Sequence, residues 1–175
     1  MSCRPLTRWL FGKLPAQGDF VSRGLDHEMR DALDHWLSAE MEAAHERFGD
    51  SFDDRYFSAP AWCFVDRDVA GAWTGGALCA SVDAAGRKFP LLMATPANDC
   101  AEALGCAAQS LEALYEGIDG RWIADRLIAA EPQPGALPWQ PADPAWALLG
   151  EDGAACVLPG RFPAGVVAAM LELAA

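Results

Sequence analysis

The sequence predicts an α/β fold, and three observations support this class. Short apolar runs with the composition of β-strands alternate with longer segments whose apolar residues recur at helical spacing. Glycine and proline gather between these segments, where turns are expected. The chain has 175 residues, close to the ~150 residues usual for one domain, and shows no internal repeat or clear domain boundary. We therefore expect residues 1–175 to form a single α/β domain.

The first expected elements lie on either side of a glycine-rich turn. Residues 9–11 (Trp-Leu-Phe) form an apolar run that predicts a strand ending near Gly12. The strongest helix signal in the chain then begins at Asp26, a residue type that caps helix N-termini. Apolar side chains recur at intervals of three and four from Met29 to Phe48, and Gly49 follows. This pattern predicts an amphipathic helix from about 26 to 49.

Three strands are expected in the middle of the chain, at residues 60–65, 72–82 and 89–95. Both faces of the segment 72–82 are small or apolar, which is typical of a strand covered by helices on both sides. Pro90 stands near the start of the third strand, where a missing N–H group is tolerated.

The remaining segments predict two helices, an extended proline-rich segment, two more strands and a closing helix. The proline-rich segment 132–144 holds five of the twelve prolines, which excludes a helix and leaves a surface segment or a docking strip. The expected elements are helices at 100–116 and 121–130, strands at 146–149 and 155–158 joined through 150–153, and a helix at 163–173.

Charge and cysteine content limit the classes of function. The chain carries 25 acidic and 13 basic side chains, a formal charge of −12, which disfavours nucleic acid and anionic membranes as partners and favours a basic or neutral protein. The six cysteines include no CxxC pair, and four lie within apolar runs. The N-terminus lacks a signal-peptide core, and no run approaches the ~20 apolar residues that span a bilayer. We expect a reduced, cytoplasmic protein without a metal or cofactor.

Catalytic motifs are not evident in the sequence. His27, His35 and His45 all fall on the first predicted helix, and the outer two are about 27 Å apart along it, too far to share a metal or a proton. No nucleophile elbow, zinc-binding helix, phosphate-binding loop or dinucleotide fingerprint is present. We interpret the three histidines as solvated side chains of the helix surface.

Two glycine-rich turns carry the chain's most unusual polar residues. The first, residues 12–21 (GKLPAQGDFV), offers Lys13, Gln17 and Asp19. Either this turn presents Lys13 and Asp19 to a partner or ligand, or Asp19 caps the approach to the first helix while the glycines shape a tight turn.

The second turn, residues 81–91 (SVDAAGRKFPL), offers Ser81, Asp83 and Arg87. Asp83 and Arg87 stand four residues apart across Gly86, so they either pair and lock the loop or contribute to binding. An enzyme or small-ligand protein would use Lys13, Asp19, Asp83 and Arg87 as one polar cluster.

Most of the seven tryptophans fall in predicted strands or on helix faces and are expected in the core. Trp139 differs because Pro138 and Pro141 flank it in the extended segment. It is either an exposed anchor for a partner or part of a loop packed onto the domain.

The two turns, with the segments Trp73-Thr74-Gly75 and Pro60-Ala61-Trp62-Cys63-Phe64 between them, resemble the TagF (ImpM) family of type VI secretion-associated proteins over about residues 9–95. Two departures from the family wording are Cys63, where an arginine is expected, and Ala84-Ala85, where a bulkier pair is expected. If that arginine contributes to binding, this member binds its partner more weakly.

The resemblance implies a three-layer α/β domain with a central mixed sheet flanked by helices. It further implies a cytoplasmic accessory protein without catalytic activity, acting as a post-translational repressor. Its partner would be the forkhead-associated scaffold protein of the type VI system, whose activation by threonine phosphorylation it opposes. Lys13, Gln17, Asp19, Ser81, Asp83, Arg87 and Trp139 would then be partner-binding or motif residues, and the oligomeric state stays open.

Overall fold

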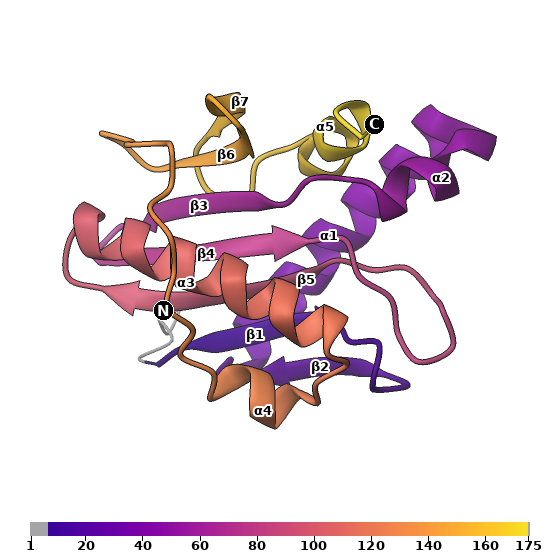
Figure 1. The fold of residues 1–175 in the computed structure, drawn as a ribbon, viewed down its shortest axis with the longest axis horizontal. Helices are drawn as coiled ribbons and strands as arrows, with labels where there is room; N and C mark the ends of the chain where they lie inside the picture. The colour runs from indigo at the N-terminus through magenta and orange to yellow at the C-terminus, as the bar shows by residue number, and fades with distance from the viewer. Residues whose placement is uncertain (1–6, 175) are drawn as a thin grey trace.

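The computed structural model describes residues 7–174, and in these residues seven strands form one sheet with helices on both faces (Figure 1). The strand order is β2-β1-β5-β4-β3-β6-β7. The strands are β1 (Trp9–Lys13), β2 (Phe20–Arg23), β3 (Trp62–Arg67), β4 (Trp73–Cys79), β5 (Leu91–Ala97), β6 (Ala145–Gly150) and β7 (Gly153–Pro159). The helices are α1 (His27–Phe48), the short 3₁₀ turn η1 (Gly49–Ser51), α2 (Phe52–Phe57), α3 (Cys100–Asp119), α4 (Ala124–Ile128) and α5 (Val166–Glu172).

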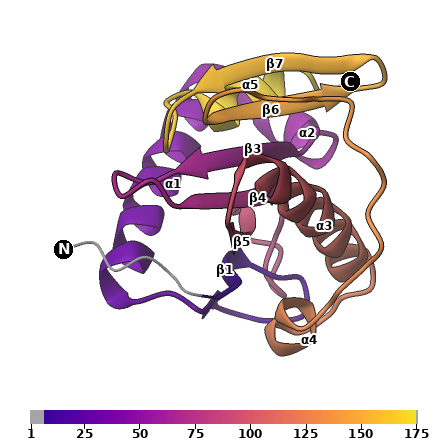
Figure 2. The ribbon, with the colours of Figure 1, turned by 90° about the vertical axis from the view of Figure 1, so that its left-hand side faces the viewer.

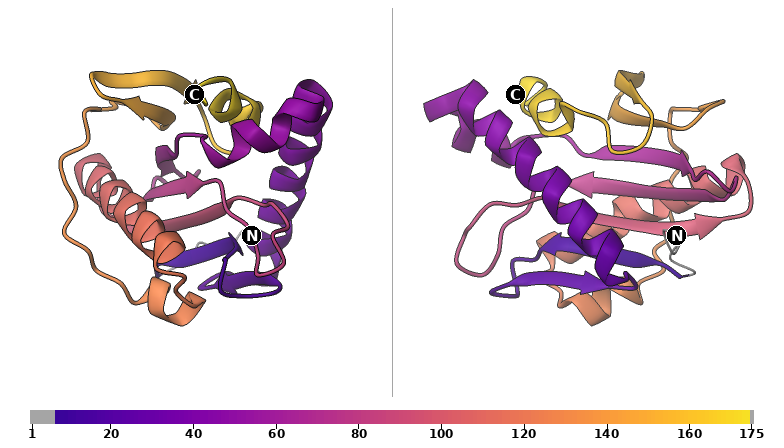
Figure 3. Two further views of the ribbon diagram at one scale, coloured as in Figure 1. Left: turned by 45° about the vertical axis from the view of Figure 1, so that its right-hand side comes forward. Right: turned by 180° about the vertical axis from the view of Figure 1, so that it is seen from behind.

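The two faces of the sheet carry separate hydrophobic cores because successive strand residues point to opposite sides. On one face, aromatic residues such as Trp62 and Trp146 pack under α1, α2 and α5. On the other, smaller residues such as Cys63 and Ala77 pack under α3 and α4. Figure 2 and the left view of Figure 3 show α1 and α3 on opposite sides of the sheet.

Helix α1 forms where the apolar periodicity predicts it. Asp26 accepts a hydrogen bond from the Met29 N–H through Oδ1 at 2.8 Å, which satisfies one of the unpaired donors of the first turn. Met29, Leu33, Leu37 and Met41 fall on one buried stripe, since residues four apart lie on the same side of a helix. The helix ends at Gly49, whose φ of +50° few other residues adopt.

The expected mixed sheet is wrong, because every strand pair is antiparallel. Short turns join β3 to β4 and β6 to β7, and such hairpins run antiparallel by necessity. Two connections contain helices, the one from β2 to β3 and the one from β5 to β6. The strands that follow them, β3 and β6, are also antiparallel to their neighbours in the sheet. Helices between strands therefore indicated an α/β fold, but they did not fix the strand directions.

Two elements escape the sequence patterns. Strand β2 has only four residues and begins within the first glycine-rich turn, so it is too short to show a clear alternation of its own. Helix α2 has six residues and is separated from α1 only by the three residues of η1. The second middle strand also ends at Cys79 rather than residue 82, because residues 80–90 leave the sheet as a loop.

Free thiols fit the interpretation of the cysteines as small hydrophobic residues. Cys63 and Cys79 are buried, and Cys100, Cys106 and Cys156 are partly buried. Cys3 and the N-terminal residues examined for a signal sequence lie outside the described residues. Within residues 7–174, none of the helices combines the length and apolarity needed to cross a bilayer.

Helix α3 lies directly against strand β4, and glycine makes this approach possible. A Cβ atom on Gly75 would lie 1.7 Å from the carbonyl oxygen of Ala103. A Cβ atom on the next residue, Gly76, would meet the Phe64 ring at 2.5 Å on the opposite face. The consecutive glycines thus allow the sheet to be covered closely on both sides.

We predict that Gly75→Ala lowers the free energy of unfolding by about 3 kcal/mol or more, because α3 must move off the sheet to admit the methyl group. Gly105→Ala is the matched control, since Gly105 lies within α3 with open space beside it. It should raise stability by about 1 kcal/mol through helix propensity. Urea unfolding of both variants measures the difference, and equal stability of the two would contradict this packing.

Candidate functional site

The two glycine-rich turns meet at the carboxylate of Asp83. Oδ2 of Asp83 lies 3.0 Å from Lys13 Nζ and 2.7 Å from Arg87 Nε. The Asp83 side chain has no solvent exposure and that of Lys13 has 10%, whereas Arg87 is largely exposed. A cation from each turn therefore pairs with one buried anion, so of the two alternatives for Asp83 and Arg87 the structure has the internal pair.

Backbone groups complete the coordination of Asp83. Its Oδ1 accepts hydrogen bonds from the N–H groups of Ala85 and Arg87, each at 3.0 Å. Burial by itself would raise the pKa of Asp83, but these bonds, with those from Lys13 and the Arg87 guanidinium, outweigh it. The pKa of Asp83 is held well below its usual range, so this side chain stays ionised at neutral pH.

Further hydrogen bonds join the turns to each other and to α4. Ser81 Oγ donates to the Lys13 carbonyl at 2.7 Å, and Arg87 Nη2 donates to the Gly18 carbonyl at 2.6 Å. Gln17 accepts from the Ala84 N–H through its backbone carbonyl, and from the Ala124 N–H through its side chain, both at 2.8 Å. We refer to Lys13, Gln17, Ser81, Asp83 and Arg87 as the clasp.

Tyr56 attaches the clasp to α2. Its hydroxyl donates to the Ser81 carbonyl at 2.8 Å and accepts from the Ser81 N–H at 3.0 Å, so both backbone groups of Ser81 are satisfied by one buried side chain. Desolvation raises the pKa of Tyr56, which keeps the hydroxyl protonated as the donor.

Glycine and aromatic residues close the clasp on its sheet side. Gly12 has a φ of +136°, and a Cβ atom there would lie 2.1 Å from the Pro90 carbonyl oxygen. The Lys13 ammonium lies 5.0 Å from the centroid of the Phe20 ring, and Phe20 meets Phe89 edge to face at 4.7 Å. The glycine and aromatic residues of both motifs therefore have structural roles in packing around Lys13.

Other candidate residues lie apart from the clasp. Asp19 is exposed and has no hydrogen-bond or ion-pair partner among residues 7–174. The expectation that it caps the approach to the first helix is wrong, since Asp26 does so. Trp139 is partly buried and packs on the core under α3, which favours the packed-loop interpretation. His27, His35 and His45 are exposed, as expected.

The position of the clearest departure from the family wording is fully buried. Cys63 has no solvent exposure and packs under α3 and α4, where burial raises the pKa of its thiol to about 12. The side chain at this position is therefore part of the core in this chain.

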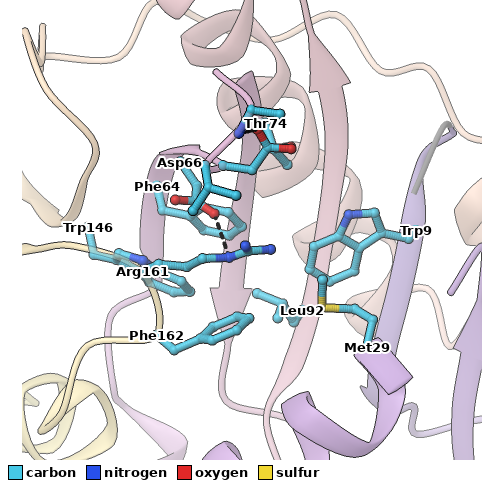
Figure 4. A pocket seen from close by; sticks show the side chains of 12 residues that line it. Trp9, Met29, Phe64, Asp66, Thr74, Leu92, Trp146, Arg161 and Phe162 are labelled. Atoms are coloured by element: carbon cyan, nitrogen blue, oxygen red, sulfur yellow. Dashed lines mark hydrogen bonds and ion pairs between the residues drawn. The ribbon is translucent and has the colours of Figure 1, made fainter. Parts of the chain in front are cut away.

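A separate pocket of about 120 Å³ lies on the α1 side of the sheet (Figure 4). Its walls include aromatic residues from different strands, Trp9, Phe64 and Trp146, together with Phe162. This volume is close to the ~150 Å³ of an engineered cavity that holds benzene. Tertiary folding brings these residues together from both ends of the chain, and no local motif marks them.

An ion pair lies over this pocket. Arg161 Nε contacts Asp66 Oδ2 at 3.0 Å, and the carboxylate is mostly buried. Burial raises the pKa of Asp66, partly offset by Arg161. Because Arg161 and Asp66 form an ion pair with each other, these two charged side chains of the pocket wall partly neutralise one another. Among residues 7–174 no group of three or more metal-ligating side chains gathers.

Fold and site together define a class: an α/β protein with a seven-stranded antiparallel sheet, in which two long polar motifs are joined by a buried carboxylate. Residues 10–130 match the family model of the TagF N-terminal domain, type VI secretion system-associated. The chain belongs to this family, so it is a type VI secretion-associated protein. The resemblance found in the sequence is thereby confirmed.

A solved structure shares the fold. The crystal structure of PA0076 from Pseudomonas aeruginosa PAO1 superposes with a TM-score of 0.61 at 24% sequence identity. The alignment covers 95% of this chain and 78% of that one. A comparison with curated proteins finds no match.

We predict that Asp83→Asn destabilises the protein at neutral pH, because it leaves the Lys13 ammonium buried without its anion. The folded-state pKa of Asp83 is lowered, so its contribution is present above the unfolded-state value of 3.8 and is lost as the pH falls below it. Wild type and variant should therefore converge in stability in acid. Urea unfolding over a pH series measures this, with exposed Asp19→Asn as control; a constant difference down to the lowest pH would contradict the assignment.

Proposed function

We propose that this protein is a non-catalytic, cytoplasmic repressor of the type VI secretion system that acts by binding the forkhead-associated scaffold protein of the system. The proposal starts from membership of the TagF family, which is associated with the type VI secretion system. The observation that supports a non-catalytic role is the clasp, because the ionisable side chains of the two motifs that could take part in catalysis pair with one another instead.

The clasp favours binding over catalysis. A general acid, base or nucleophile must reach substrate, whereas the Asp83 side chain is closed to solvent and accepts four hydrogen bonds or ion pairs. Asp19, the other carboxylate of the alternative enzyme cluster, is exposed and does not join it. The alternative of an enzyme or small-ligand protein built on these turns therefore has less support than a binding protein.

A repressor of this kind needs a surface and no chemistry. Preferential binding to the inactive form of the scaffold shifts its equilibrium, and about 5.5 kcal/mol of differential affinity reverses a hundredfold preference. The formal charge of −12 makes a basic surface of the scaffold the natural counterpart. Threonine phosphorylation adds negative charge to the scaffold, so it should weaken this association if the modified site lies near the interface.

Isothermal titration of the purified chain into the scaffold protein of the same type VI gene cluster tests the proposal. We predict micromolar or tighter binding that weakens as salt rises, because charges across the interface are screened. The unphosphorylated scaffold should bind more tightly than the threonine-phosphorylated form.

An unrelated forkhead-associated domain serves as the control and should give no heat. In cells, excess chain should lower type VI secretion. Absence of binding to both scaffold forms, with secretion unchanged, would refute the repressor mechanism.

A further inference from the structure

An open apolar groove lies between the C-terminal ends of α2 and α3. It consists of two adjoining hollows of about 520 and about 170 Å³, which share Phe57, Ala80 and Ile118. Ala59, Ala61 and Cys79 line the larger hollow, and Tyr56, Ser81 and Val82 line the smaller one. We refer to this surface as the α2–α3 groove.

Two aromatic side chains are exposed along this groove. Phe57 has 68% of its surface in contact with solvent, and Tyr115 has 49%. Both line the larger hollow, so they form one patch and are not isolated surface residues. Contiguous exposed apolar surface bordered by polar residues is characteristic of protein interaction sites.

Acidic side chains border the groove on α3. Glu112, Glu116 and Asp119 are exposed and follow one another at intervals of four and three, which places them on one side of the helix. Within residues 7–174 none of the three has an ion-pair partner, and Glu116 and Asp119 line the groove itself.

The nearby cations Lys88 and Arg121 form no ion pair with Glu112, Glu116 or Asp119. Lys88 lies 5.1 Å from the Phe57 ring centroid on the α2 side and pairs with Asp53 at 3.1 Å. Arg121, just beyond α3, donates to the Pro15 carbonyl at 2.8 Å. Arg126, which lines a hollow together with Glu116, lies over the Trp122 ring and forms no ion pair with that carboxylate, so the α3 border of the groove keeps its negative charges.

The clasp holds one wall of the groove in place. Ser81 lines the smaller hollow while its backbone is fixed by Tyr56 and its hydroxyl donates to the Lys13 carbonyl. Rigid walls reduce the entropy lost on binding. All residues of the groove fall within the family-matched segment 10–130, whereas the pocket over Trp146 depends on residues beyond it.

We propose that the α2–α3 groove binds an extended segment of the partner in which a bulky apolar side chain is followed closely by lysine or arginine. The apolar side chain packs between Phe57 and Tyr115, and the cation pairs with Glu116 or Asp119. This inference rests on the proposed function in taking the scaffold protein as the source of the segment, and it assigns the interface that the function needs.

The first test compares variants of the full chain in titrations against the scaffold protein. Phe57→Ser should weaken binding at least about tenfold, as loss of an aromatic anchor does. Glu116→Lys combined with Asp119→Lys should weaken it and reduce its salt dependence. Two controls should bind as wild type. One is Val157→Ser, at another exposed apolar position, on β7, and the other is Glu151→Lys with Asp152→Lys, the same charge change in the β6–β7 turn.

A peptide pair separates this inference from the identity of the partner. One synthetic peptide has Leu-Phe flanked by lysines, and the other has the same residues flanked by glutamates. The lysine peptide should bind wild type saturably, bind Phe57→Ser at least about tenfold more weakly, and bind better than the glutamate peptide. If wild type does not bind the scaffold but binds the peptides in this pattern, the proposed repressor function is refuted, whereas the proposed binding of a peptide segment in the α2–α3 groove is supported.

Equal binding of the scaffold, or of the lysine peptide, by the Phe57→Ser and Val157→Ser variants would refute the α2–α3 groove as the binding site. Absence of any saturable lysine-peptide binding to wild type would overturn it as well. Melting temperatures close to wild type for all variants ensure that lost affinity is not caused by lost folding, and Phe57 and Val157 are both exposed enough to tolerate the change to serine.

Discussion

The buried carboxylate of Asp83 is the constraint on which the rest of this structure depends. A charge removed from water is tolerated only when donors surround it, and here the donors come from two turns far apart in the sequence. Lys13 extends from the end of β1, while Arg87 and the backbone amides come from the loop between β4 and β5. Satisfying this one anion therefore fixes the loop against the sheet, and Tyr56 extends the same network to α2.

The two faces of the sheet solve different packing problems. The α1 face is filled with large rings, and Trp146 stacks on Phe64 at 4.2 Å while meeting Trp36 edge to face at 5.5 Å. The α3 face instead uses glycine, alanine and cysteine, which let a helix lie close to β4.

This division separates stability from recognition. The motif residues that attract notice in the sequence stabilise the fold from inside, and they hold the wall of a groove whose recognition features lie on α2 and α3. Phe57 and Tyr115 belong to segments in which the sequence shows no distinctive motif. In this chain, the most unusual sequence is thus found where a buried charge imposes strict geometry, because an exposed binding surface imposes weaker local requirements.

The sequence by itself determined the α/β class, the long helix from Asp26 and most strands, because these depend on local periodicity and capping, whereas it left open whether Asp83 pairs with Arg87. Only the tertiary structure decided the antiparallel order of the strands, the partnership of Lys13 with Asp83 and the exposure of Asp19. Only it could assemble the Trp9, Phe64 and Trp146 pocket and the α2–α3 groove, since their residues come from distant segments. Local patterns encode which face of an element is buried, whereas the partner that buries it is set by packing of the whole chain.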